Sequence, residues 1–329
     1  MIRTASRPVV VASAMAATVT ALAQQPLFRA GIEVVRIDLS VTQDGAPARG
    51  LRLEDFEVRD QGVKQQVTGF LYEEVPLEGY LVLDASNSVA GQKLIDLRRA
   101  ALAFLAGFRT GDQAALLTFS HEVTQHQPLT SDVAAVRRAL DAVKTGGTTA
   151  LNDALFAAML QRRPNERRSV AVVFSDGFEN TSWLSEAEVL GTAERGDMVV
   201  YGVTLTPEPR GGWDQPVMLP PSQPSSSYAT GIMDPASRTL SPEFPERAAL
   251  PAENAFLRRV AAATGGRMWA AGSSAQLEEA FVAVLNDIRS RYLLTYTPEP
   301  PPKPGWHTLQ VKVKRGKSQV IARPGYFVR

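Results

Sequence analysis

The chain contains no cysteine among its 329 residues. It therefore cannot form disulfides, carry a lipid on a cysteine, bind a metal through thiolates or use a cysteine nucleophile. The charges also nearly cancel, because 35 basic residues face 34 acidic ones and leave a formal net charge of +1. A chain with this balance has no overall field that would attract nucleic acid or an anionic membrane surface, so we expect neither partner.

Histidine and the common catalytic motifs are also scarce. The three histidines are His121, His126 and His307, and we expect all three at the surface. The sequence contains no Gly-x-Ser-x-Gly, His-Glu-x-x-His or Gly-x-x-x-x-Gly-Lys-Ser/Thr motif. These motifs carry the machinery of many hydrolases and nucleotide-binding enzymes, so their absence favours a protein that is not an enzyme.

Long apolar runs are confined to the start of the chain. Arg3 and Arg7 precede a run of small and apolar residues from Val9 to Leu22, and Ala23 follows. This layout predicts a secretory signal peptide over residues 1–23, and hence an exported protein, periplasmic or extracellular; an uncleaved membrane anchor is the alternative. No later segment approaches the roughly 20 apolar residues of a spanning helix, so the mature chain is expected to have no integral membrane segment.

Residues 24–76 have the pattern of a small β segment. Apolar and polar residues alternate strictly from 35 to 42, which predicts a half-buried strand. Further short strands are predicted at 56–58 and 67–71, with turns at Asp44-Gly45 and Gln61-Gly62.

The C-terminal segment, residues 291–329, is similar in character. It offers strand-like stretches at 292–296, 309–313 and 319–322. Because domain termini often lie close together, we expect the two flanks to pack as one small β domain.

Residues 77–290 alternate between strands and helices. The predicted strands end at or near 84, 119, 174 and 205, and a further short strand is predicted around Met268. The predicted helices cover 91–108, 131–143, 150–162, 185–195, 254–265 and 277–292. Repeated βα units predict an α/β fold with a doubly wound, mostly parallel sheet, inserted between the two β flanks. Residues 206–252 are rich in Pro, Ser and Gly and are interpreted as a solvated insertion, with a partner-binding lid as the alternative.

Two of the apolar strands end at carboxylates. The first stops at Asp84 and is followed by Ser86 and Ser88, and the second is followed by Asp176. The spacing of the first three residues lets one extended loop aim three oxygens the same way, and ligands in parallel sheets gather at the carboxyl ends of strands. Magnesium binds oxygen and is usually held by one or two carboxylates, with hydroxyls and water completing its shell.

The chain here resembles a known family. The segments Asp84-Ala85-Ser86-Asn87-Ser88, Gly147-Thr148-Thr149-Ala150-Leu151-Asn152-Asp153-Ala154-Leu155 and Val173-Phe174-Ser175-Asp176-Gly177 look like the three parts of a metal-ion-dependent adhesion site. Their order is similar to that of a von Willebrand factor type A domain, and the resemblance covers about residues 77–290. The flanks, including Phe56-Glu57-Val58 and Arg323-Pro324-Gly325-Tyr326, resemble exported bacterial proteins built on that domain.

The resemblance implies a set of ligands. Asp84, Ser86 and Ser88 would belong to the first loop, Thr149 to the second and Asp176 to the third. Thr149 is preferred because it keeps the expected spacing to the following helix, whereas Thr148 would need one extra residue. Asn152 and Asp153 are interpreted as helix-start residues rather than ligands.

The function implied is divalent-cation-dependent protein binding, in adhesion or assembly. Mg²⁺ is the expected cation, with Mn²⁺ or Ca²⁺ as alternatives, and an acidic residue of a partner would complete its shell. Two rival hypotheses remain: a structural or assembly component in which the metal only stabilises the fold, and a metal-dependent hydrolase.

Two further groups of residues are given structural interpretations. Trp213, Trp269 and Trp306 are expected to pack in the core or on strands rather than form a ligand platform. The arginine cluster is interpreted as a solvated helix end and loop rather than a phosphate site; its members are Arg162, Arg163, Arg167 and Arg168.

Overall fold

The computed structural model describes residues 34–72, 75–163, 167–176, 179, 181–205 and 255–328. The predicted signal peptide, the insertion at 206–252 and Trp213 lie outside these residues. Among the residues described, no helix has both the length and the apolar character needed to cross a membrane.

The α/β part is built on a six-stranded sheet with the order β11-β10-β9-β6-β7-β8. Its strands are β6 (Leu77–Asp84), β7 (Gln113–Phe119), β8 (Val123–Thr130), β9 (Arg168–Phe174), β10 (Val199–Leu205) and β11 (Met268–Ala271). All neighbours in this sheet are parallel except β7 and β8. Every residue of β6 and of β9 is buried, and each strand contains an apolar run of the kind expected for strands covered on both faces.

Strand β8 was not predicted. It lies antiparallel to β7 at the edge of the sheet, and most of its residues are polar and partly or fully exposed. An edge strand of this kind has no apolar run and tolerates Pro128, so its pairing with β7 is a tertiary feature that local sequence does not indicate.

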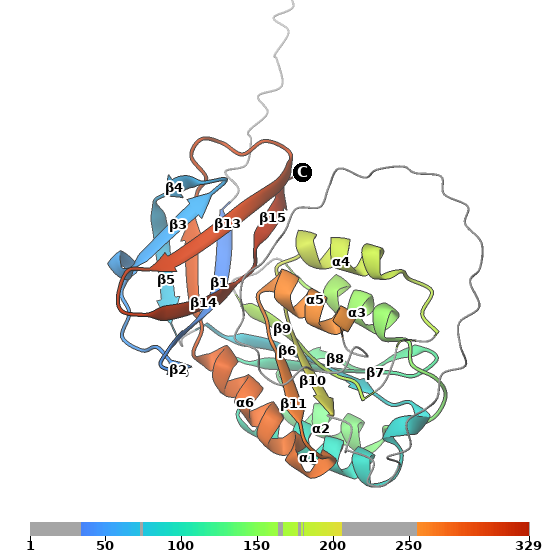
Figure 1. Cartoon of the computed structure of the whole chain (residues 1–329). Coiled ribbons are helices and arrows are strands. Elements are labelled where there is room, and N and C mark those ends of the chain that lie inside the picture. The colour runs from blue at the N-terminus through green and yellow to red at the C-terminus, as the bar shows by residue number, and fades with distance from the viewer. Residues whose placement is uncertain are drawn as a thin grey trace, which may run out of the picture. The chain divides into compact units, whose positions relative to one another are not determined.

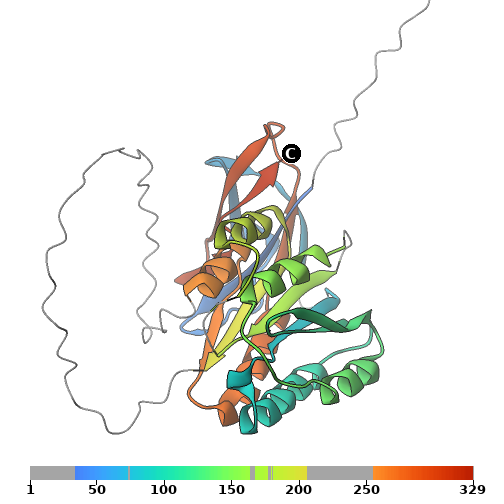
Figure 2. The same ribbon diagram turned by 90° about the vertical axis from the view of Figure 1, so that its right-hand side faces the viewer.

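In the part of the chain that the structure describes, six α-helices cover the two faces of the sheet, as Figures 1 and 2 show. One face packs against α1 (Gln92–Ala106), α2 (Val133–Asp141) and α6 (Leu277–Arg289). The other packs against α3 (Leu151–Leu160), α4 (Glu186–Arg195) and α5 (Ala255–Thr264). The doubly wound α/β fold is therefore confirmed.

The helix boundaries agree with local signals except at one end. Ser185 and Glu188 form the predicted capping box at the start of α4, where the Glu188 amide donates to Ser185 Oγ at 3.4 Å. The last helix was predicted to reach Tyr292, but it ends at Arg289 and Tyr292 begins a strand. The large aromatic side chain of Tyr292 continues the spacing of apolar residues along the helix, so periodicity alone extends the predicted helix too far.

The two flanks pair in antiparallel sheets. One has the order β14-β1-β12-β5, with β2 paired to β1, and the other has the order β15-β13-β3-β4. The strands are β1 (Val35–Gln43), β2 (Ala46–Pro47), β3 (Phe56–Asp60), β4 (Val63–Gln65), β5 (Val67–Tyr72), β12 (Tyr292–Tyr296), β13 (Gly305–Val313), β14 (Ser318–Ala322) and β15 (Gly325–Val328). The N- and C-terminal flanks thus form the expected β unit (Figure 1).

The alternation in β1 is matched by its burial. Val35, Ile37, Leu39 and Val41 belong to the apolar core between the two flank sheets. Of the other predicted packing residues, Trp269 lies with its ring centroid 5.5 Å from that of Tyr201, and Trp306 is half-buried on β13.

A buried ion pair joins the flank to the α/β part. Asp38 on β1 accepts from Arg168 Nε at 2.5 Å and also from the guanidinium of Arg291. Arg291 is fully buried and donates to the Tyr201 hydroxyl at 2.9 Å. Burial by itself would raise the pKa of Asp38, but the charges of Arg168 and Arg291 outweigh it and hold that pKa below its usual range.

Candidate metal centre

The first loop of the site starts where β6 ends. Asp84 is completely buried at the carboxyl end of this central strand. Its Oδ1 accepts from the Ser86 amide at 2.8 Å, and its Oδ2 accepts from Ser175 Oγ at 3.0 Å. Ser175 was not among the predicted site residues, although it stands directly after β9 and beside Asp176. These two bonds fix the carboxylate between the first and third loops.

The hydroxyls of Ser86 and Ser88 connect the first loop to the second carboxylate of the site, that of Asp176. Ser86 Oγ and Ser88 Oγ are 3.0 Å apart, and Ser88 Oγ donates to Asp176 Oδ1 at 2.6 Å. The structure therefore brings together four of the five predicted residues from two loops: Asp84, Ser86, Ser88 and Asp176.

The second loop is held against the first by two backbone hydrogen bonds. The Gly146 amide donates to the Ala85 carbonyl at 2.8 Å, and the Asn87 amide donates to the Gly147 carbonyl at 3.1 Å. Gly147 has φ +79°, a conformation that favours glycine, so this contact depends on the Gly-Gly pair.

The two candidate threonines of the second loop differ in burial. Thr149 is 5% exposed, whereas Thr148 is exposed to solvent. The Ala150 amide, directly after Thr149, donates to the Ser120 carbonyl at 2.7 Å and fixes the loop to the end of β7. Thr149 is therefore the buried threonine of this loop, and its role as a ligand stays a prediction.

Lys93 is a member of this cluster that the sequence analysis missed. Its Nζ lies 2.6 Å from Asp176 Oδ2, and its side chain is 42% exposed while that of Asp176 is 2% exposed. Lys93 is the second residue of α1, shortly after Ser88. The sequence signal that could have indicated Lys93 is its position in the first turn of the helix that follows the serine loop.

The electrostatics of the two carboxylates are unequal. Burial raises the pKa of Asp84 to about 6, and the nearby charge of Asp176 adds to this effect. Hydrogen bonds from Ser86 and Ser175 act in the opposite direction. A buried carboxylate beside a second carboxylate is stabilised by any positive charge that enters the space between them.

Asn152 and Asp153 lie at the start of α3 and fasten the chain that follows the third loop. The Asn152 amide donates to Glu179 Oε2 at 2.9 Å, and its side-chain amide donates to the Leu184 carbonyl at 3.0 Å. Asp153 accepts from the amides of Trp183 and Leu184, each at 3.0 Å. Both residues stand in the first turn of α3, the position predicted for them, and their contacts tie this turn to the segment 179–184.

The same segment exposes an aromatic side chain that the sequence analysis did not single out. Trp183 is 95% exposed, although its backbone is tied to Asp153. Asp153 is the third residue of α3, which begins directly after the second loop. Its bond to the Trp183 amide therefore holds Trp183, in the segment that follows the third loop, beside the start of this helix.

The three histidines occupy different places. His121 is exposed and lies beside Gly147, where an added Cβ would be 2.4 Å from His121 Nδ1. His126 and His307 are half-buried rather than at the surface as expected: His126 Nε2 lies 2.8 Å from Thr118 Oγ1, and His307 Nδ1 lies 3.2 Å from Asp60 Oδ1. The last two are thus held by neighbours on β7 and β3.

The donor set of the centre is made of oxygens. Within the described parts of the chain, no three His, Cys, Asp or Glu side chains gather as a metal-binding group. The centre has two carboxylates, and its remaining oxygens are hydroxyls, which is a set suited to a hard cation rather than to zinc held by nitrogen and sulfur.

The comparisons with known proteins agree with this fold. Residues 80–179 match the family model described as von Willebrand factor type A domain, a range that includes all five predicted ligands. With the parallel sheet covered by helices on both faces, this match shows that the α/β part of the chain is a von Willebrand factor type A domain. No curated protein sequence matches the chain.

Several solved structures are similar to the chain. An aerotolerance-related membrane protein from Bacteroides fragilis is 17% identical, with a TM-score of 0.44, and the match covers 64% of this chain and 98% of that one. A von Willebrand factor type A protein from Catenulispora acidiphila is 13% identical, with a TM-score of 0.48, covering 82% and 73%. Proximal thread matrix protein 1 from the mussel byssus, with a zinc-occupied metal-ion-dependent adhesion site, is 16% identical, with a TM-score of 0.46, covering 70% and 49%.

Proposed function

We propose that the protein is an exported, divalent-cation-dependent protein-binding module. The residues that would hold the cation are Asp84, Ser86, Ser88, Thr149 and Asp176. The observation that carries the proposal is the chain of contacts from the Ser86 hydroxyl through Ser88 to Asp176, next to the buried Asp84 carboxylate.

The residues present fit a hard divalent cation. Asp84 and Asp176 supply two carboxylates, and the other three residues supply neutral hydroxyls, as expected for Mg²⁺ with Mn²⁺ or Ca²⁺ as alternatives. The ammonium group of Lys93 already lies against Asp176, so this carboxylate accommodates a positive charge in the present arrangement.

The same donor set supports a binding role for the centre. When bound, the cation would offer a position, otherwise taken by water, to an acidic side chain of a protein partner. The five protein oxygens would leave room for such a group, since Mg²⁺ takes about six ligands. In this proposal the chain presents the cation and performs no catalysis.

Calorimetric titration of the purified chain with MgCl₂, MnCl₂ and CaCl₂ tests the cation. We expect one saturable site, and an affinity at least about tenfold lower in Asp176→Asn, because one of two carboxylates is lost. Glu54→Gln is the matched control, since its exposed carboxylate lies in the β flank and its loss should leave the affinity unchanged.

Capture of partners from an envelope extract of the source organism tests the binding role. Partners retained with Mg²⁺ should be released by a chelator and should not bind Asp176→Asn. Substituting Asp or Glu of the captured partner by Asn or Gln should reproduce this loss. Binding that persists in chelator, with metal affecting only the melting temperature, would instead favour the structural role.

A further inference from the structure

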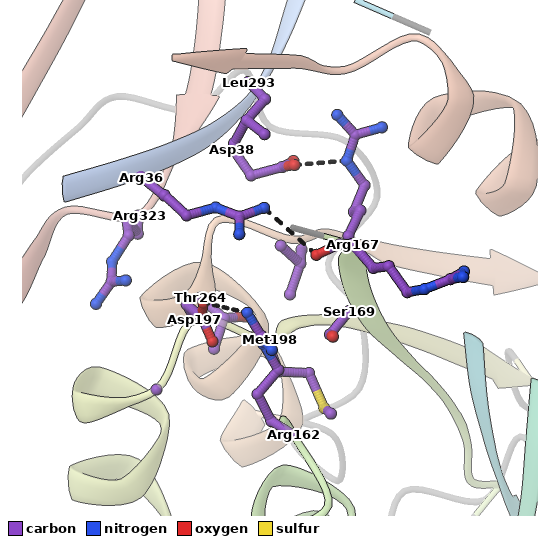
Figure 3. A pocket seen from close by; sticks show the side chains of 13 residues that line it. Arg36, Asp38, Arg162, Arg167, Ser169, Asp197, Met198, Thr264, Leu293 and Arg323 are labelled. Carbon is purple, nitrogen blue, oxygen red and sulfur yellow. Dashed lines mark hydrogen bonds and ion pairs between the residues drawn. The ribbon is translucent and has the colours of Figure 1, made fainter. Parts of the chain in front are cut away.

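A cavity at the junction of the β flank and the α/β part is lined by arginines from both. The volume of this cavity is about 30 Å³. Arg36 on β1 and Arg323 between β14 and β15 come from the flank, and Arg162 and Arg168 come from the α/β part. Figure 3 shows the side chains of Arg36, Arg162 and Arg323 approaching this space from different elements.

The lining carries an excess of positive charge. Five of its residues are arginines and two are aspartates, Asp38 and Asp197. Of the arginines, Arg167 directs its guanidinium to the Gly111 carbonyl, and Arg36 donates from Nη2 to the neutral Arg167 carbonyl at 3.4 Å. Both aspartates are engaged: Asp38 with Arg168 and Arg291, and Asp197 with Arg162 Nη2 at 2.7 Å. A partly enclosed space lined mainly by one sign of charge concentrates ions of the opposite sign.

The interpretation of Arg162 and Arg168 as a solvated helix end is wrong. Their side chains are 10% and 3% exposed. Arg167 does extend away from the cavity and donates to the Gly111 carbonyl. The folded chain thus turns part of a sequence cluster inwards, where Arg36 and Arg323 meet it.

Arg323 is the residue that most strongly indicates a ligand. Its guanidinium donates to two backbone carbonyls, from Nε to Gly325 at 2.6 Å and from Nη2 to Glu194 at 3.0 Å. Burial lowers the pKa of Arg323 from its usual range, with only partial compensation from Asp197, Tyr296 and Tyr326. A desolvated guanidinium held by neutral carbonyls would gain much from an anion.

We infer that this cavity is a binding site for a small free oxyanion of the phosphate or sulfate class. Guanidinium groups match the oxygens of such anions with paired hydrogen bonds, and the cavity is of a size for a small ion rather than a nucleotide. Since its arginines belong to both parts of the chain, the bound anion would connect the β flank to the α/β part. The site is separate from the metal centre and independent of the proposed binding function.

Calorimetry and thermal unfolding of the full chain test this site. Titration with inorganic phosphate, in chloride buffer of matched ionic strength, should show one site with a dissociation constant of about 1 mM or below. Phosphate and sulfate should raise the melting temperature in a saturable way. Arg323→Gln and Arg36→Gln should each weaken phosphate binding about tenfold or more, because a charge-assisted donor is lost.

Arg138→Gln is the matched control, since Arg138 is an exposed arginine on α2. Its phosphate affinity should equal that of the unsubstituted chain. Absence of saturable binding to the unsubstituted chain, which needs no variant to fold, would overturn the inference. An equal loss in Arg138→Gln, or tighter binding of ATP than of inorganic phosphate, would also contradict a site for a small free oxyanion.

Discussion

The ammonium nitrogen of Lys93 lies 2.6 Å from Asp176 Oδ2, while Asp176 Oδ1 accepts a hydrogen bond from Ser88. The second carboxylate of the proposed metal centre is therefore shared between a serine hydroxyl and a lysine. Because the lysine is partly exposed, it can move away into solvent. A cation that binds Asp176 would have to compete with this internal positive charge.

Replacing Lys93 by Met should therefore increase the affinity for Mg²⁺. An ion pair with one exposed member contributes modestly, so we expect a gain of about threefold to tenfold in calorimetry. The melting temperature of Lys93→Met in chelator should fall, because Asp84 and Asp176 then lack this compensating charge. Lys64→Met, which removes an exposed lysine from β4, should change neither value; an unchanged affinity in Lys93→Met would contradict the competition.

Thr149 and Thr148 can be distinguished by isosteric substitution. Thr149→Val removes a buried hydroxyl and should lower Mg²⁺ affinity by about tenfold or more, provided that this hydroxyl is a ligand. Thr148→Val is the internal control, because its side chain is exposed one residue away. The reverse pattern in calorimetry would transfer the ligand role to Thr148.

Asp38→Asn should destabilise the fold strongly. The substitution leaves Arg168 and Arg291 buried without their shared carboxylate, which costs about 3–5 kcal/mol in comparable buried pairs. Urea unfolding measures this loss, and Asp44→Asn in the exposed turn after β1 is a control that should remain close to the unsubstituted chain. A loss below 1 kcal/mol, on the order of an exposed pair, would show that the pair is dispensable.

The lowered pKa of Asp38 makes the stability of the folded chain depend on pH. The pKa of this carboxyl is lowered in the folded chain relative to the ordinary value of 3.8, so its contribution is present above that value. The stability that the Asp38 carboxylate contributes is lost as the pH falls from 3.8 through the lower pKa of the folded chain. In this range the unfolded chain binds a proton at Asp38 more readily than the folded chain does, so protonation favours unfolding. Urea unfolding from pH 6 to pH 3 should show a steeper loss in the unsubstituted chain than in Asp38→Asn, and parallel curves would contradict the assignment.

Trp183→Ala should affect partner binding without affecting stability. The side chain is 95% exposed, so its removal should change the free energy of unfolding by less than about 0.5 kcal/mol. If the proposed partner docks over the metal centre, loss of this aromatic contact should weaken binding about tenfold or more, as at interface hot spots. Leu160→Ala is the control, because Leu160 is 63% exposed at the C-terminal end of α3, whereas Trp183 is tied to Asp153 near the N-terminal end. This substitution should leave binding intact.

Much of the fold was predictable because its signals are local. The apolar runs of β6 and β9, the alternation in β1 and the capping box of α4 each reflect burial or hydrogen bonding within a few residues. The domain boundaries proposed from the sequence, at 77 and 290, stay predictions.

What could not be predicted depends on neighbours distant in sequence. Strand β8 exists through its pairing with β7. Arg162 pairs with Asp197 and lines the same cavity as Arg323 of the flank. At the metal centre, the two strand-end carboxylates were evident, but the position of Lys93 depends on how α1 starts after the serine loop. Sequence periodicity predicts which apolar residues face the core, but it does not predict which charged side chains pair. Such pairs become visible only in the folded structure.

The pairing of β1 sets an order for folding. Val35 pairs with Tyr296 and Leu39 pairs with Ala322, so β1 cannot complete its sheet until nearly the whole chain has been synthesised. All strands of the α/β sheet lie between Leu77 and Ala271 and can assemble earlier. Closing such a long loop is slow. The earliest strand described has only the two-residue β2 as a nearby partner. It is therefore among the last to complete its pairing, and it remains open to wrong pairing during that time.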